Sequence, residues 1–79
     1  MPAYFFHVDH GQPDLDEDGT DLTDIAEARY QAIDVLANLL RNGAGEAVLN
    51  GTPLTLWVTD RPGGTGARLL TVFVSTSPR

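Results

Sequence analysis

Three aspartates near the N-terminus have the types and the spacing that could bind a metal ion. Asp14, Asp16 and Asp18 alternate along the chain, and Gly19 follows directly, which is how the calcium-binding loop of an EF-hand begins. That loop also needs a bidentate glutamate at its twelfth position, where this sequence has Ile25. We therefore expect a solvated turn leading into a helix, and we keep weak calcium or metal binding as the alternative.

His7, Asp9 and His10 form a second set of potential ligands, suited to zinc or iron. The two histidines are three residues apart on or beside an expected strand, so they tend to point to opposite faces. The sequence has no third histidine and no cysteine to complete a site. A packed or exposed pair of histidines is the expected role, and we predict no cofactor.

No set of residues is typical of catalysis. Ser75 and Ser77 lie in the C-terminal tail and Tyr30 on the polar side of the expected helix, none with an evident base and orienting group. The glycine-rich residues 63–66 lack the following helix and lysine of a phosphate-binding loop. We therefore predict that the protein is not an enzyme.

Arg29 is the charged residue that the helical pattern places among apolar side chains. It falls on the same arc as Ile25, Ile33 and Leu36. A guanidinium there either extends to water along its own stem or accepts a carboxylate partner. We predict a structural ion pair in which Arg29 anchors the acidic loop, with the extended side chain as the alternative.

These residues must be positioned by a short series of regular elements. Residues 3–9 are compact and aromatic, and residues 54–60 and 68–75 alternate in polarity, so all three predict strands. Residues 10–24 are polar and read as a loop, with a brief extended piece at 20–22. Residues 63–66 form the turn between the last two strands.

Residues 24–43 predict the one helix. Asp24 is a good N-cap and Glu27 lies three residues later, as in a capping box, while Gly43 is a typical stop. The residues spaced to face a core are Ile25, Ala28, Ala32, Leu36 and Leu39. The following residues, 43–53, are expected to be a connector without regular structure.

The order strand, helix, strand, strand predicts an α+β fold of the β-α-β-β type in a single domain, residues 1–79. A right-handed crossover through the helix would make the first two strands parallel. Placing the C-terminal strand between them makes every neighbouring pair antiparallel. We therefore expect a small three-stranded antiparallel sheet with the C-terminal strand in the centre and the helix on one face.

One helix covers only one face of such a sheet. The aliphatic side that suits the helix consists of Leu54, Leu56, Val58, Leu70, Val72 and Val74, with Tyr4, Phe6 and Val8 expected to join it. The open face would carry Phe5, His7, Trp57, Leu69 and Phe73. An apolar patch left in water usually marks an interaction site; the alternative is that the acidic loop or the tail covers it.

Composition limits the classes of partner. The 79 residues carry a net charge of −6, which repels phosphate backbones, so we expect no nucleic-acid binding. No apolar run approaches the ~20 residues of a membrane span, and no basic residue precedes the apolar N-terminal segment, so we expect no membrane association and a cytoplasmic location. Without cysteine, disulfides are excluded.

Two segments carry a family resemblance. Residues 1–11, "MPAYFFHVDHG", and 16–32, "DEDGTDLTDIAEARYQA", resemble a family of small proteobacterial proteins, common in rhizobial-type bacteria, that open Met-Pro-x-Tyr-Phe-Phe-His. That family is a domain of unknown function, so the resemblance implies a shared fold and no catalytic residues. A fainter resemblance is to small antitoxin-like domains, which bind a protein partner.

The function expected from these observations is that of a small, acidic, non-enzymatic interaction domain. A symmetric pair of chains is the commonest way to cover an apolar face, so the leading hypothesis is a homodimer formed through the open sheet face. The alternatives are an antitoxin-like or regulatory module that binds another protein, and a weak calcium- or metal-binding module that uses the acidic loop of residues 14–21.

Overall fold

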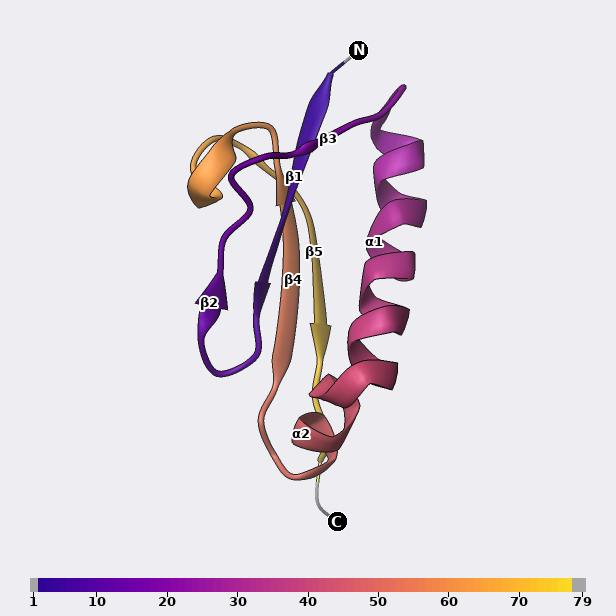
Figure 1. Ribbon diagram of the computed structural model, residues 1–79, viewed down its shortest axis with the longest axis vertical. Helices are drawn as coiled ribbons and strands as arrows, with labels where there is room; N and C mark the ends of the chain where they lie inside the picture. The colour runs from indigo at the N-terminus through magenta and orange to yellow at the C-terminus, as the bar shows by residue number, and fades with distance from the viewer. Residues whose placement is uncertain (1, 78–79) are drawn as a thin grey trace.

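The computed structural model describes residues 2–77, so Met1, the first residue of the resemblance's opening motif, lies outside them. The chain forms one sheet with the long helix on one side and a loop on the other (Figure 1). In chain order the elements are β1 (Ala3–Asp9), β2 (Pro13–Asp14), β3 (Thr20–Asp21), α1 (Ile25–Leu39), the π-type turn η1 (Leu40–Ala44), α2 (Gly45–Leu49), β4 (Leu54–Thr59), the 3-10 turn η2 (Pro62–Gly64) and β5 (Arg68–Val74).

The sheet has five strands, and every pair of neighbours is antiparallel. The order across it is β2-β1-β4-β5, and the two residues of β3 pair with the start of β1. The α+β class is as predicted. The expectation of three strands with the C-terminal strand in the centre is wrong, because β4 is central and β5 lies at the edge.

The loop between β1 and α1 explains this difference in topology. It turns back after β1, and β3 brings the chain to the end of the sheet where β1 began, pairing Tyr4 with Thr20. The helix therefore starts beside the N-terminal end of β1 and runs alongside it (Figure 1). Strand β4 then returns antiparallel to β1 and pairs with it directly, so no crossover is needed and no central position is left for β5.

The start of α1 has the predicted cap. The Asp24 side chain accepts a hydrogen bond from the Glu27 amide at 3.1 Å, and the Glu27 carboxylate accepts one from the Thr23 amide at 2.9 Å. The first bond satisfies an amide that the first helical turn leaves without a partner, and the second ties the residue before the cap to that turn. The capping prediction is confirmed, except that Glu27 reaches the residue before the N-cap.

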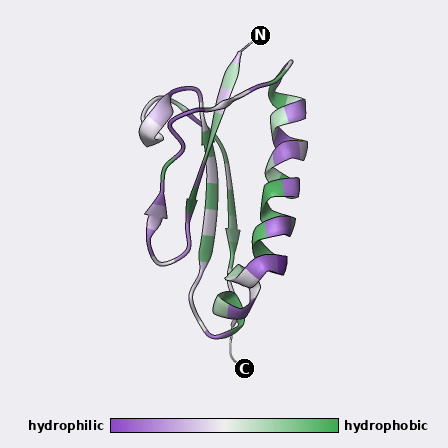
Figure 2. Ribbon diagram, viewed as in Figure 1, coloured by the Kyte–Doolittle hydropathy of each residue, from purple (hydrophilic) through white to green (hydrophobic). Residues whose placement is uncertain are grey.

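One side of α1 is buried against the sheet, as the spacing of its apolar residues predicts. Ala28, Ala32 and Leu36 are buried and Leu39 is half-buried, while Ile25 at the first turn is exposed. In Figure 2 the hydrophobic stripe of the helix faces the sheet and its hydrophilic side faces outward. The two buried alanines let the helix approach the sheet closely.

The segment after α1 is more regular than predicted. The chain turns at Gly43, whose φ of 119° suits only glycine, and then forms α2 where a connector was expected. Val48 of α2 is buried in the core. Val48 anchors α2 to the core, and this helix of five residues is too short for a periodic pattern to be visible in the sequence.

The core lies between α1 and the sheet and contains the predicted aliphatic set. Leu54, Leu56 and Val58 of β4 are fully buried there. The other sheet residues that pack in or against it are Tyr4, Phe6, Val8, Leu70, Val72 and Val74. Among residues 2–77, no helix has the length and apolar character needed to cross a bilayer.

Candidate functional site

The sheet face opposite α1 is divided between a covered and an uncovered part. The predicted open face comprised Phe5, His7, Trp57, Leu69 and Phe73. Phe5 and His7 are buried, Trp57 is half-buried, and Leu69 and Phe73 are exposed. The cover is the loop after β1, residues 10–19, which contains most of the acidic segment and was the alternative expected for this face. The expectation that Phe5 and His7 lie on an open surface is therefore wrong.

His7 holds the loop to the sheet through both ring nitrogens. Its Nδ1 accepts a hydrogen bond from the Asp16 amide at 3.0 Å, so the proton of the neutral ring is on Nε2. Nε2 donates to the Thr59 hydroxyl at 2.8 Å, and that hydroxyl donates to the Arg61 carbonyl at 2.6 Å. The side chains of His7 and Thr59 are 0% and 1% exposed, so the network links loop, sheet and hairpin in the interior.

The environment of His7 favours its neutral form. Desolvation by burial lowers the pKa of His7, and the positive charge of Arg68 acts in the same direction. The carboxylates of Asp16 and Glu17 raise it, but they do not outweigh burial. A neutral ring is also what the geometry requires, because a protonated Nδ1 could not accept the Asp16 amide.

Asp16 organises the loop itself. Its carboxylate accepts hydrogen bonds from the amides of Phe6, Asp18 and Gly19 at 3.0, 3.1 and 3.1 Å. Desolvation acts to raise the pKa of this carboxyl, but the three amide donors and the nearby His7 outweigh it and the pKa is lowered. The Asp16 carbonyl in turn accepts from the Gly63 amide at 3.0 Å, so the loop is also bound to the β4–β5 turn.

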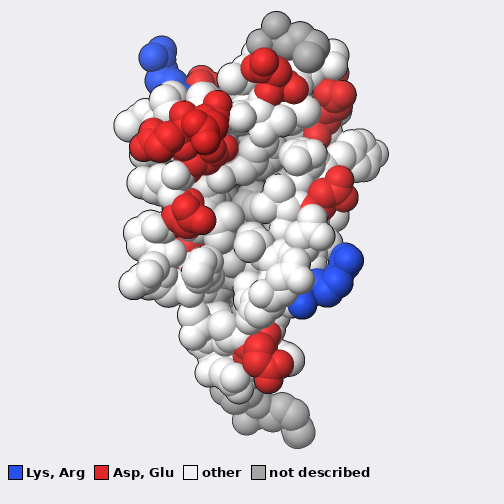
Figure 3. Space-filling view, viewed as in Figure 1, with Lys and Arg blue, Asp and Glu red and all other residues white. Residues whose placement is uncertain are grey.

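The hydrogen bonds of Asp16 make this residue less available as a metal ligand. Asp14 lies in β2 opposite Val8, and the oxygens of Asp16 already accept backbone amides. Within residues 2–77 no group of three or more histidine, aspartate and glutamate side chains is arranged to hold a metal ion. Figure 3 shows acidic side chains gathered over the segment between β2 and β3, where they form a solvated surface.

Gly19 allows the loop to approach the sheet closely. Its φ is +76°, and a Cβ added there would lie 2.7 Å from Cε2 of the Phe5 ring. Any larger residue would therefore push the loop away from Phe5. The glycine that resembles part of a calcium-binding loop has instead a steric role over a buried aromatic ring.

Trp57 marks the boundary between the covered and uncovered parts. Its ring centroid lies 5.3 Å from that of His7 at an angle of 39°. The guanidinium carbon of Arg68 lies 5.0 Å from the centroid of the same ring, a cation–π contact. Beyond Trp57 only β5 remains, and there the loop provides no cover.

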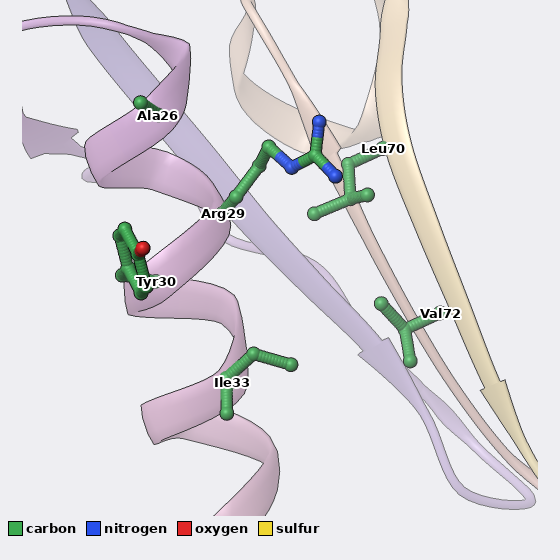
Figure 4. Close-up of a pocket in the computed structure, with 6 residues that line it drawn as sticks. All are labelled: Ala26, Arg29, Tyr30, Ile33, Leu70 and Val72. Carbon is green, nitrogen blue, oxygen red and sulfur yellow. The ribbon is translucent and has the colours of Figure 1, made fainter.

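The uncovered part is β5 and the side of α1 next to it. Phe73 is 63% exposed and Leu69 is 41% exposed, and Leu70, Val72 and Val74 on the helix side are half-buried. Between α1 and β5 lies a groove of about 550 Å³, lined by Ala26, Arg29, Tyr30, Ile33, Leu70 and Val72 (Figure 4). We call the side chains of residues 69–74 together with this groove the β5 surface.

Arg29, predicted to anchor the acidic loop through an ion pair, lines the groove beside β5. Its exposed side chain extends from α1 toward β5, with the guanidinium beside Leu70 (Figure 4). The loop over Phe5 and His7 lies on the opposite face of the sheet. The Arg29 side chain therefore extends away from it, and not in the direction predicted for an anchor of that loop.

Two features of the site were not found by sequence reasoning. The polar residue Thr59 lies on the same face of β4 as Trp57, which could have signalled a buried partner for His7. The sequence contains no comparable signal for the edge position of β5, because the composition of this strand resembles that of a central strand. Only the path of the loop places it at the edge.

Comparison with known proteins supports the resemblance to a family of unknown function. The model of a family described as "Domain of unknown function (DUF6894)" matches residues 3–75. No curated protein and no solved structure matches the chain. The functional proposal therefore rests on the geometry of the chain itself.

Proposed function

The chain belongs to the DUF6894 family, a domain of unknown function, and from its geometry we propose that it is a non-enzymatic interaction domain that self-associates through the β5 surface. The observation that carries the proposal is that β5 lies at the edge of the sheet. It is a seven-residue strand at the end of the sheet, and its outer side has no strand partner among residues 2–77. Such an edge offers a row of backbone donors and acceptors to another chain.

The other edge of the sheet shows what a protected edge looks like. Strand β2 has only two residues, Pro13 and Asp14, both exposed. Shortness, proline and charge are the usual devices against edge-to-edge pairing. Residues 70–74 of β5 contain none of them, so this edge is chemically open to another strand.

The distribution of charge favours the same surface. With a net charge of −6, two copies repel each other wherever their acids meet. The acidic loop lies over β1 and reaches the turn before β5, and the only charged residue of β5 itself is Arg68. Contact through β5 therefore keeps the acidic loops of two copies apart.

The exposed apolar side chains supply the driving force. Burying a large aromatic or aliphatic side chain contributes on the order of 2–3 kcal/mol, and Phe73, Leu69 and Ile33 are all exposed on this surface. The interface expected from the sequence was the whole face opposite α1. The proposal places it at the β5 end of the sheet, because the loop already covers Phe5 and His7.

Binding of a different protein is the second candidate function. The same open edge would accept an extended segment of a regulatory partner, as in β-strand addition. An acidic side chain of that partner could reach Arg29, whose guanidinium lies in the groove beside Leu70. The calcium-binding alternative has less support, since the central ligand Asp16 is occupied by amides.

The first test replaces Phe73, an exposed residue of β5, with aspartate. Self-association through β5 predicts that wild type sediments as a dimer in the micromolar range and that Phe73→Asp sediments as a folded monomer, because a charge would be buried at the interface. Gln12→Asp is the control. Gln12 is exposed and directly precedes β2, at the opposite edge of the sheet, so this variant introduces the same charge away from β5 and should remain a dimer.

Circular dichroism checks that both variants keep the helix signal. A wild-type chain that remains monomeric throughout the micromolar range would contradict self-association and leave binding of another protein as the stronger candidate. A Phe73→Asp variant that is folded and still dimeric would place the interface elsewhere.

A further inference from the structure

We infer that the partner seated on the β5 edge is a second copy of this chain, paired antiparallel with β5 about a two-fold axis at Val72, so that one sheet runs through both copies. This inference rests on the proposed function and adds to it the arrangement of the interface. A two-fold interface uses the same surface on both copies and must therefore be self-complementary. The sequence of β5 and the pairing of β5 with β4 provide the test of that complementarity.

A bulge defines which part of β5 can pair regularly. Val58 pairs with Leu70, but the next residue, Thr59, pairs with Arg68, so Leu69 is an extra residue in β5. A bulge interrupts the ladder and commonly ends pairing. The regular part of the strand is therefore residues 70–74, and its middle residue is Val72.

Pairing about Val72 matches the side chains on the helix side of the sheet. In an antiparallel pair with this centre, Leu70 faces Val74 of the second copy and Val72 faces Val72 of the second copy. All three of these side chains are half-buried in the single chain and pack against its core. Each would gain an apolar cross-strand neighbour, and no polar side chain would be buried with them.

The opposite side of the strand is matched as well. There Thr71 faces Phe73 of the second copy, and the two phenylalanine rings become diagonal neighbours. Pairs of an aromatic with a β-branched residue are among the favourable cross-strand pairs, and diagonal neighbours lie within reach of aromatic side chains. The register therefore covers Phe73, the most exposed apolar side chain of β5.

The neighbouring register is less favourable. Centring the pair on Thr71 would place Arg68 opposite Val74 and the bulged Leu69 opposite Phe73. The first pair sets a charge against a core side chain, and the second requires regular pairing where the ladder is already broken. The centre at Val72 avoids both.

The groove beside α1 would be extended by this pairing. Its floor includes Leu70 and Val72, and its walls carry Arg29, Tyr30 and Ile33. Across the two-fold axis the second copy contributes the same floor, so the two grooves would adjoin on the helix side of the joint sheet.

The absence of cysteine from the sequence makes the register directly testable by single-thiol variants. Directly opposed residues of an antiparallel pair have Cα atoms about 4.5–5.5 Å apart, within the range of about 4.4–6.8 Å that a disulfide allows. Under mild oxidation Val72→Cys should form an intermolecular disulfide. Thr71→Cys alone should not, because its Cα atoms in the two copies would be ~8 Å apart.

A second measurement uses a mixture of two single-thiol variants, both of which leave the side chains on the helix side of the sheet unchanged. Thr71→Cys and Phe73→Cys change exposed side chains, and these positions oppose each other in the proposed register. An equal mixture of the two variants should give the mixed disulfide as the main cross-linked product, identified by mass. Wild-type sedimentation under the same conditions shows whether a dimer exists at all.

Each outcome has a defined meaning. A mixed disulfide together with the Val72→Cys homodisulfide supports the register. Cross-linking by Thr71→Cys alone moves the axis to Thr71 and overturns the inference, while the proposed self-association stands. A wild-type dimer in which none of these thiols cross-links also overturns it, and a wild-type monomer overturns both the inference and the proposed function.

Discussion

The two faces of the sheet are covered by different physical means. On one face α1 buries apolar side chains, and Leu54, Leu56 and Val58 are completely enclosed. On the other face a polar loop lies over Phe5 and His7 and is held by hydrogen bonds through His7 and Asp16. The helix cover depends on removing apolar area from water. The loop cover depends on a few directed hydrogen bonds and on the protonation states of His7 and Asp16.

This difference shows why the β5 surface remains open. On the helix side the residues of β4 are fully buried and those of β5 only half-buried, and the loop is tied to β1 and to the β4–β5 turn. Neither cover encloses β5. An edge strand with apolar side chains on both sides is what remains, and this is the surface to which the proposed function and the register at Val72 assign a partner.

The largest expected effect comes from weakening the helix-covered face. Leu36 is buried in the core, and Leu36→Ala should lower the free energy of unfolding by about 2–5 kcal/mol, through lost burial and the cavity left behind. In so small a domain this is a large part of the total stability. Urea denaturation followed by circular dichroism measures the change.

Leu49→Ala is the matched control, because Leu49 is exposed on α2. It should change the unfolding free energy by much less than Leu36→Ala. A Leu36→Ala midpoint within error of wild type would show that the helix cover does not dominate stability, and the contrast between the two faces would fail.

A smaller effect is expected from releasing the loop-covered face. Asp16→Ala removes the acceptor of three backbone amides, and we expect a loss of about 1–3 kcal/mol. Because the helix core is untouched, the helix signal should persist while the loop opens. Hydrogen exchange of the Phe6 and Gly19 amides, which donate to this carboxylate, should accelerate.

Asp18→Ala tests whether the effect is specific to Asp16. It removes the same charge from an exposed loop residue whose backbone amide, not its side chain, is bonded to Asp16. Its amide exchange should stay close to wild type. Equal acceleration in both variants would mean that the loop is held by something other than the Asp16 carboxylate.

The sequence predicts the helix-covered face well and the other face poorly. Spacing alone identifies Ala28, Ala32 and Leu36, because a helix repeats every ~3.6 residues and its buried side must be apolar. The cap at Asp24 is also predictable, because it depends on residues that are close together in the sequence. The family resemblance is supported in the same coarse form, as a domain of unknown function over residues 3–75.

The loop-covered face depends on contacts between residues distant in sequence. His7 and Thr59 are 52 positions apart, and no local pattern links them. The strand order also depends on β3, a two-residue element that returns the chain to Tyr4. A segment so short carries no periodic signal, and for this reason the central position of β4 and the edge position of β5 could not be predicted.

The smallest expected effect is a change of stability with pH that belongs to the loop-covered face alone. The pKa of His7 in the folded chain is lowered from 6.5, mainly by burial. The unfolded chain therefore takes up the proton first as the pH falls. Stability is fully present above 6.5 and is lost as the pH falls from there toward the folded pKa, because in that range the unfolded chain binds the proton while the folded His7, which accepts a hydrogen bond from the Asp16 amide, stays neutral.

Asp16 contributes in the same direction but in a lower range. Its pKa is lowered from 3.8, so its contribution is present above 3.8 and is lost only at more acidic pH. Urea denaturation at about pH 7.5 and about pH 5 therefore reports His7 with little contribution from Asp16. We expect wild type to be less stable at the lower pH and His7→Gln to lack this part of the pH dependence. His10→Gln should keep this pH dependence, because it alters an exposed residue outside the hydrogen bonds of His7. A His7→Gln variant with the full wild-type pH dependence would show that the loop cover does not depend on a neutral His7, and the two faces would then differ less than their hydrogen bonds indicate.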